Sequence, residues 1–168
     1  MISSTVCPSP VGELTLACDE TGLLGLWLSG QKYHGSTLGL AMTQNADAPA
    51  LREAVQWLDR YFAGERPDAA ALTLAPRGSA YRQEVWRALC EIPYGEVASY
   101  GQVAQTVAQR LGTQQASARA AGGAIGHNPI SIIIPCHRVI GSNGSLTGYA
   151  GGLERKTWLL ELEGAVIL

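Results

Sequence analysis

The sequence lacks an apolar run long enough to cross a bilayer, and its first residues lack a basic segment followed by an apolar one. These absences argue against an integral membrane protein and against a secretion signal, so we expect a cytoplasmic protein with no membrane partner. Charged residues make up 15% of the chain and hydrophobic residues 46%. This balance predicts a soluble globular protein with one good core or two small ones, and it argues against disorder.

Cysteine is also scarce, and its four copies at positions 7, 18, 90 and 136 lie far apart without a C-x-x-C pair. The spacing argues against a zinc ribbon and against a secreted disulfide framework, so we expect free thiols. A zinc site built from Cys7, Cys18 and His34 would lack a fourth ligand. We therefore predict no metal site and no cofactor.

The formal net charge of −2 hides a difference between the two halves of the chain. Residues 1–76 hold four basic and eight acidic side chains, whereas residues 77–168 hold eight basic and six acidic ones. The second half is thus the better partner for a polyanion, although the excess of positive charge is small.

The first half of the chain predicts a small sheet and one helix. Alternating apolar residues at 14–16, turn residues at 19–22 and an apolar run at 23–28 predict a hairpin. Residues 30–45 read as a loop with room for a weak strand. A helix is expected from Asp47 and Pro49 to Gly64, with apolar positions at helical spacing: Leu51, Ala54, Val55, Leu58, Tyr61 and Phe62.

Residues 65–78 contain two prolines and an alanine run and are the best candidate for a linker. We place a domain boundary there, between residues 76 and 77.

The second half predicts four helices. Ser79 and Ser99 can cap the first two, Gly112 ends the second, and Thr113 can start the third, which gives a helix-turn-helix pattern. The last helix is expected at 153–163, ended by Gly164, with these side chains buried: Leu153, Trp158, Leu159 and Leu162.

The third predicted helix, over residues 115–126, consists almost entirely of alanine and glycine, with one long side chain at Arg119. A helix that reads sequence in the major groove needs several polar side chains to meet the base edges. Small residues instead allow very close approach to another surface. Two interpretations stay open: a helix that packs on other helices, or one that binds DNA with little sequence preference, with Arg119 inserted in the minor groove.

Residues 132–140 hold the strongest candidate for chemistry. Cys136 and His137 are adjacent, and Pro135 stiffens the approach to the cysteine. A thiolate becomes a strong nucleophile when an oriented imidazole can take its proton. These residues alone fit a buried structural thiol equally well. Glu163, at a helix C-terminus where a carboxylate is disfavoured, needs a partner, and His137 is the candidate.

Four motifs together carry a resemblance to a known family: 119–122 (RAAG), 128–129 (NP), 135–140 (PCHRVI) and 148–152 (GYAGG). Over roughly residues 77–164 the chain resembles the O6-alkylguanine-DNA alkyltransferases, the methylated-DNA–protein-cysteine methyltransferases. The resemblance implies an α+β fold, with a small ribonuclease-H-like N-terminal sheet and helix at 1–76. A mostly helical, winged helix-turn-helix-like DNA-binding and alkyl-acceptor domain would follow at 77–168.

The resemblance also implies direct reversal of O6-alkylguanine, and of O4-alkylthymine, by irreversible transfer of the alkyl group to Cys136. His137 would deprotonate the thiol through a water, and Glu163 would orient the imidazole. Asn128 would brace the turn before the active-site loop, and Tyr100 would donate to the departing guanine. The base pocket would be lined by Tyr149, Ala150, Gly151 and Val139.

For DNA, the resemblance implies a duplex partner bound through its minor groove with little sequence preference, and a flipped-out target nucleotide. Arg119 would fill the vacated stack, and the DNA-facing positions around it would be Ser117, Ala118 and Gly122. We expect a monomer and leave cooperative binding along DNA open. The chain departs from the family pattern at Ala121 and Ala150 and in a longer segment from Tyr100 to Arg119.

Two other functions compete with a suicide alkyltransferase. A lesion-sensing DNA-binding module would resemble this fold but replace the acceptor cysteine, so Cys136 argues against it. A cysteine hydrolase using Cys136, His137 and Glu163 is disfavoured because nucleophile and base are adjacent in sequence, beside a DNA-type helix.

Overall fold

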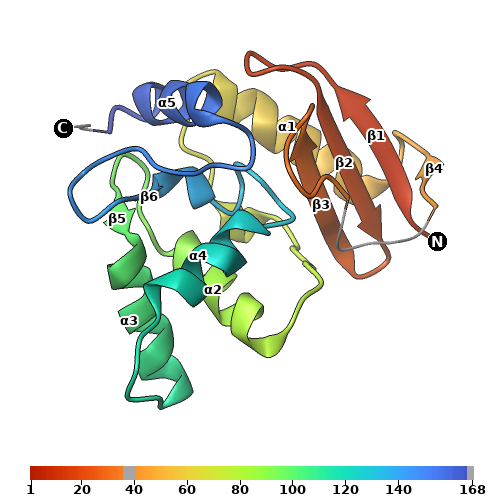
Figure 1. Ribbon diagram of the computed structural model, residues 1–168. Coiled ribbons are helices and arrows are strands. Elements are labelled where there is room, and N and C mark those ends of the chain that lie inside the picture. Colours follow the sequence, from red (N-terminus) through yellow and green to blue (C-terminus); the bar gives the residue numbers. More distant parts are fainter. Residues whose placement is uncertain (36–40, 166–168) are drawn as a thin grey trace. The chain divides into compact units, whose positions relative to one another are not determined.

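The computed structural model describes residues 1–35 and 41–165. Within these residues the chain forms two compact units (Figure 1). Unit 1 comprises residues 1–77 together with the short segment 129–131, and unit 2 comprises residues 78–128 and the chain from 132 onward. The sequence gives no sign that residues 129–131 belong with the first unit.

Unit 1 is built on a sheet with the strand order β3-β2-β1-β4. The strands are β1 (Ser3–Cys7), β2 (Leu14–Asp19), β3 (Gly22–Leu28) and β4 (Thr43–Gln44). The predicted hairpin is confirmed, because β2 and β3 pair antiparallel with Asp19 opposite Gly22. Every residue of β3 is buried, as its continuous apolar run indicates. Gly25 is required there, because a Cβ would lie 2.1 Å from the Trp27 ring.

Helix α1 (Pro49–Phe62) contacts β1, β2 and β3. Proline opens the helix, as expected for a residue without a backbone N–H. Of the predicted apolar positions, Val55 and Phe62 are only half-buried. Trp57, which was not among them, is buried. The part of the predicted 30–45 loop at residues 36–40 lies outside the described residues.

The segment predicted as a linker is partly attached to the sheet. It contains the 3₁₀ helix η1 (Ala69–Ala71), which Asp68 caps. Further on, Thr73 O accepts from Leu23 N at 2.9 Å, and Ala75 N donates to Leu23 O at 2.8 Å. These bonds pair residues 73–75 with the edge strand β3.

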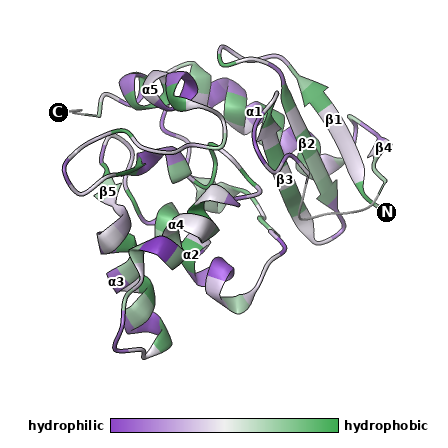
Figure 2. Cartoon of the chain, in the orientation of Figure 1, coloured by the Kyte–Doolittle hydropathy of each residue, from purple (hydrophilic) through white to green (hydrophobic). Residues whose placement is uncertain are grey.

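Unit 2 packs three helices together: α2 (Ala80–Cys90), α3 (Tyr100–Leu111) and α4 (Ala118–Gly126). Ser79 caps α2, and Ser99 and Gln102 form a reciprocal capping box on α3. Gly112 ends α3 in the left-handed conformation, as predicted. Figure 2 shows hydrophobic and hydrophilic residues alternating along α3, which matches its buried positions Val103, Ala104, Val107 and Ala108.

The predicted start of the third helix is wrong. It begins at Ala118 rather than near Thr113, because the Ser117 side chain accepts from Ala120 N at 3.0 Å and caps the helix there. Residues 113–117 form the connection between α3 and α4, which is therefore longer than the sequence pattern suggests.

The remaining elements place the residues around Cys136. The 3₁₀ helix η2 (Cys136–Arg138) leads into β6 (Val139–Ile140), which pairs parallel with β5 (Ala98–Ser99). Helix α5 (Leu153–Leu162) then contacts η2. Its predicted burial was partly wrong, because Leu153 is 48% exposed and Lys156 is fully buried. Trp158 and Leu162 are only half-buried.

These elements confirm the predicted α+β class, with a small sheet and helix followed by a mostly helical part. Among the described residues no helix is both long and apolar enough to cross a membrane.

Candidate active site around Cys136

Cys136 opens η2 and is only 6% exposed. Its backbone N–H donates to Ile134 O at 2.8 Å, a bond that spans the rigid Pro135. The same Ile134 carbonyl accepts from Asn128 Nδ2, also at 2.8 Å. Asn128 thus links the end of α4 to the residue two positions before the cysteine.

The approach to Cys136 includes a strained residue. Ile132 has φ +71°, in the left-handed region that a β-branched side chain rarely adopts, and it is 1% exposed. Such a conformation costs on the order of 1–3 kcal/mol and persists only where the surrounding structure enforces it.

His137 is fully buried, and its Nε2 lies 2.8 Å from Glu163 Oε2. An ionised carboxylate only accepts, so Nε2 carries the proton and Nδ1 is left with a lone pair. Within residues 1–35 and 41–165, Nδ1 has no hydrogen-bond partner although it is buried. The imidazole is therefore fixed by one nitrogen and able to accept a proton with the other.

Glu163 is held in its ionised form. Arg138 Nε donates to its Oε1 at 2.7 Å and Arg138 Nη2 to its Oε2 at 3.0 Å. Burial opposes ionisation, but the bonds from His137 and Arg138 outweigh it and lower the pKa of Glu163 to about 2. Burial lowers the pKa of His137, although Glu163 opposes the shift, and the resting imidazole is therefore neutral with a lone pair on Nδ1. The bidentate Arg138 is a partner the sequence did not predict.

Lys156 is a second residue that sequence reasoning missed. It is fully buried on α5, and its Nζ donates to Val139 O at 2.5 Å and to Thr147 O and Gly148 O at 3.2 Å each. All three ammonium protons are thus used, and loop 147–148 is tied to β6. Lys156 lies three positions before the buried Leu159, which places a cation on the apolar side of the helix. This spacing is the signal that could have identified it.

Burial lowers the pKa of Lys156 to about 8, while the neighbouring Cys136 opposes this shift. For the Cys136 thiol, burial raises the pKa, and hydrogen bonding from Asn128, the charge of Lys156 and the Tyr149 hydroxyl oppose the increase. A protonated resting thiol, surrounded by groups that favour the thiolate, needs a base to activate it.

Tyr100, at the first position of α3, donates its hydroxyl proton to Thr147 O at 2.8 Å. Its ring lies against α4, because a Cβ on Gly122 would be 3.8 Å from Tyr100 Cδ1. Burial raises the pKa of Tyr100, so the phenol keeps its proton and remains a donor. Tyr149 has a buried hydroxyl without a nitrogen or oxygen partner in the described residues, and burial raises its pKa well above the usual value.

The other predicted pocket residues follow in the same unit. Val139 is fully buried on β6, and its carbonyl oxygen accepts from Lys156. Ala150 and Gly151 are half-buried in the loop before α5, and Gly151 O accepts from Arg155 Nη1 at 3.4 Å.

The predicted DNA-facing residues lie on one side of α4. Ser117, Ala118 and Arg119 are exposed and Gly122 is half-buried, whereas Ala121, Ala124 and Ile125 are buried against the unit. Trp86 Nε1 donates to Ala124 O at 2.9 Å and fixes the inner side. The exposed side carries a single long side chain, Arg119.

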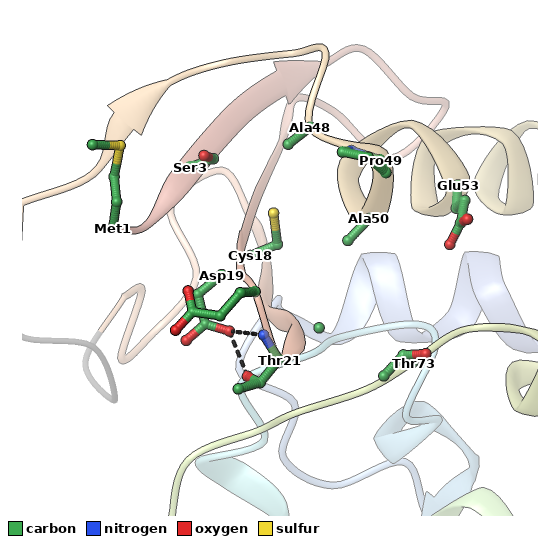
Figure 3. A pocket seen from close by; sticks show the side chains of 12 residues that line it. Met1, Ser3, Cys18, Asp19, Thr21, Ala48, Pro49, Ala50, Glu53 and Thr73 are labelled. Carbon is green, nitrogen blue, oxygen red and sulfur yellow. Dashed lines mark hydrogen bonds between the residues drawn. The ribbon is translucent and has the colours of Figure 1, made fainter.

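A separate hollow of about 440 Å³ lies in unit 1 (Figure 3). It is lined by residues such as Cys18, Asp19, Glu53 and Thr73, none of which was predicted as a site residue. Asp19 turns toward Thr21, whose backbone N–H donates to it at 2.8 Å. The described residues contain no group of three or more His, Cys, Asp or Glu side chains suited to a metal ion.

Two models of known protein families match the chain, one in each half. Residues 2–76 match the 6-O-methylguanine DNA methyltransferase, ribonuclease-like domain, and residues 80–165 match the 6-O-methylguanine DNA methyltransferase, DNA binding domain.

The sequences of individual relatives align with nearly the whole chain. A methylated-DNA–protein-cysteine methyltransferase of Mycolicibacterium paratuberculosis is 47% identical over 97% of this chain and 93% of its own. One from Methanosarcina acetivorans is 45% identical over 94% and 95%. The solved structure of Mycobacterium tuberculosis OGT in complex with DNA is 46% identical over 96% of this chain and 92% of its own, with a TM-score of 0.79.

The fold and these matches together define a DNA-repair transferase that moves an alkyl group from DNA to a cysteine of the protein. The chain belongs to the methylated-DNA–protein-cysteine methyltransferase family.

Proposed function

We propose that Cys136 is the alkyl acceptor and that His137 and Glu163 activate it. The observation that carries this proposal is the buried His137, whose Nε2 is fixed by Glu163 at 2.8 Å and whose Nδ1 is left unpartnered in the described residues beside the cysteine in sequence. A water between Nδ1 and the thiol would complete the relay, since a buried lone pair needs a partner.

The chemistry is a single displacement. The thiol proton passes to His137, the sulfur attacks the carbon attached to guanine O6, and the carbon–oxygen bond breaks as the carbon–sulfur bond forms. Guanine leaves and takes up a proton, assisted by the Tyr100 hydroxyl, so that charge does not build up on the departing base. Asn128, Lys156 and Tyr149 support the thiolate. The product is a thioether, which water does not cleave, so each molecule acts once.

We propose that Tyr149, Ala150, Gly151 and Val139 line the pocket for the damaged base, O6-alkylguanine or O4-alkylthymine. The support is structural: Lys156 binds Val139 O and Gly148 O together, which holds the glycine-rich loop against β6 beside η2. Small residues in this loop leave room for a flat ring, and their backbone groups can discriminate its edges.

We propose that α4 binds duplex DNA through the minor groove, flips the damaged nucleotide out and fills the gap with Arg119. On the exposed side of α4, the residues around Arg119 are Ser117, Ala118 and Gly122, which are small enough for the helix backbone to approach DNA closely. With a single long side chain it has little means to read base edges, so sequence preference should be weak.

We propose the functional division 1–76 and 77–168, with the acceptor and DNA-binding residues in the second part. Since all proposed site residues lie in one unit of one chain, a monomer suffices for transfer. Cooperative binding along DNA and a cytoplasmic location remain proposals from the sequence.

The test is stoichiometric transfer. The protein is incubated with a duplex that contains one O6-methylguanine, and its peptides are analysed by mass spectrometry. We expect one methyl group on the peptide bearing Cys136 and none in Cys136→Ser, with Cys90→Ser as the matched control that reacts normally. Binding to the lesion without transfer would instead indicate a sensing module, and repeated thioester turnover would indicate a hydrolase.

A further inference from the structure

The segment 129–131, just after α4, belongs to the sheet of unit 1. Leu26 N donates to Pro129 O at 2.8 Å, and Ser131 N donates to Leu26 O at 3.0 Å. Leu26 and Ile130 thereby form a parallel bridge on the edge of β3. The chain that leads to Cys136 is therefore held by backbone bonds to the N-terminal unit.

One side-chain bond completes this attachment. Gln31 is 6% exposed, and its Oε1 accepts from Leu28 N at 2.8 Å and from Ser131 Oγ at 3.1 Å. Both lone pairs of the amide oxygen are thus used. Ser131 is 2% exposed, so its hydroxyl has no access to solvent that could replace Gln31. The two residues are 100 positions apart in sequence.

The next residue is the strained Ile132, and Cys136 follows four positions later. A left-handed isoleucine relaxes unless both of its flanks are held. On the far side, Ile134 O is held by Asn128 Nδ2. On the near side, Ser131 is held by Leu26 and Gln31. Cys136 N bonds to the same Ile134 O, so relaxation at Ile132 would move the nucleophile.

We propose that Gln31 is a positioning residue for alkyl transfer, which acts through its hydrogen bond to Ser131 to hold the strained turn that places the Cys136 sulfur. The inference rests on Cys136 being the acceptor. In-line displacement is sensitive to the placement of the attacking atom, and small misplacements reduce the rate without weakening substrate binding. Gln31 and Ser131 lie in the same unit, and the effect passes along the chain from Ser131 through Ile132 to Cys136.

The experiment measures the single-turnover rate constant at saturating methylated duplex, the dissociation constant for the same duplex, and the urea midpoint. The variants are Ser131→Ala, Gln31→Met and the double variant. Val11→Ala is the control, because Val11 is buried in the same unit but does not bond to residues 129–131. The pH profile of Cys136 alkylation by iodoacetamide is measured in parallel.

We expect Ser131→Ala to lower the rate constant by about threefold to tenfold, the range that loss of one hydrogen bond corresponds to, with unchanged DNA affinity. Its iodoacetamide profile should move to higher pH, as the sulfur leaves the groups that favour the thiolate. Ser131→Ala should have no further effect in the Gln31→Met background, and Val11→Ala should lower the urea midpoint without changing the rate constant.

A wild-type rate constant in Ser131→Ala, independent losses in the double variant, or an equal rate loss in Val11→Ala would each overturn the proposal. A failure of the proposed function is distinct, because it would appear as no methyl group on the Cys136 peptide of the unmodified protein, or as methyl transfer that persists in Cys136→Ser.

Discussion

Glu163 occupies a position that its own helix disfavours. It caps the C-terminus of α5, where the macrodipole repels a carboxylate, yet its side chain is fully buried. The hydrogen bond from His137 and the charged, bidentate Arg138 compensate, and they lower the pKa of Glu163 to about 2. In the proposed relay, a carboxylate that stays ionised in the interior would stabilise the imidazolium formed when His137 takes the thiol proton.

We predict that Glu163→Gln slows transfer by about tenfold or more, because the amide can still accept from Nε2 but supplies no charge. The measurement is the single-turnover rate on methylated duplex DNA. Glu161→Gln, an exposed position on the same helix, is the matched control and should react normally. An unchanged rate in Glu163→Gln would remove this residue from the relay.

The Glu163→Gln variant should also change how the free energy of unfolding depends on pH. Since the folded pKa of about 2 lies below the ordinary value of 4.5, ionised Glu163 contributes stability above pH 4.5, and this contribution is lost as the pH falls from 4.5 toward 2. We therefore expect Glu163→Gln to cost about 2–3 kcal/mol at pH 7 and to flatten the fall of unfolding free energy in that acid window. Urea titrations between pH 2 and pH 7 measure it.

The sequence pointed to the residues of the proposed relay, but not to the bidentate Arg138 that keeps Glu163 ionised. Cys136, His137 and Glu163 are chemically distinctive types, and the predicted contact between His137 and Glu163 is present at 2.8 Å. Lys156 was missed because a lysine on a helix normally reaches solvent. Its burial depends on three carbonyl oxygens from β6 and the following loop, which no local pattern reveals.

At the scale of elements, periodicity and caps predicted most helices well. Ser79, Ser99 and Gly112 end or begin helices as expected. The predicted start of α4 was wrong. Thr113 and Ser117 are both good cap residues, and local sequence does not distinguish between them, whereas in the structure Ser117 caps the helix. Leu153 was predicted buried, yet it lies at the exposed first turn of α5.

Arg119 is the side chain of α4 with the reach to enter a base stack. We predict that Arg119→Ala lowers the single-turnover rate on duplex DNA by about tenfold or more, because unstacking a paired base costs a few kcal/mol that the arginine would offset. The rate on the same lesion in a single strand should change little. Arg87→Ala, which removes a charge from the exposed face of α2, is the control. Equal losses on both substrates would contradict the role of Arg119.

At the scale of the whole molecule, the chain passes from unit 2 into unit 1 and back at residues 129–131. This threading could not be predicted, because the pairing of Ile130 with Leu26 joins positions far apart in sequence, and the short segment carries no strand pattern. The domain boundary predicted near residue 76 separates the two parts along the chain, but it does not account for residues 129–131, which belong to unit 1.

The threading has a thermodynamic consequence that hydrogen exchange can measure. The Ser131 amide, bonded to Leu26 O, should open with the sheet of unit 1. We predict that its free energy of opening, and the dependence of that free energy on urea, match those of the amides of the inner strand β2 within about 1 kcal/mol. Exchange that instead follows the amides of α4 would show that the segment opens with unit 2.

The small side chains of α4 also affect the entropy that the protein loses when it binds DNA. A side chain that becomes immobile on binding loses rotamer freedom, and arginine loses as much as any, up to about 2 kcal/mol. Alanine and glycine have none to lose. If α4 is the DNA-facing helix, each encounter with DNA immobilises essentially one long side chain, so the side-chain entropy lost at each site is small. The helix can therefore approach DNA closely without its affinity being reduced by the ordering of many side chains.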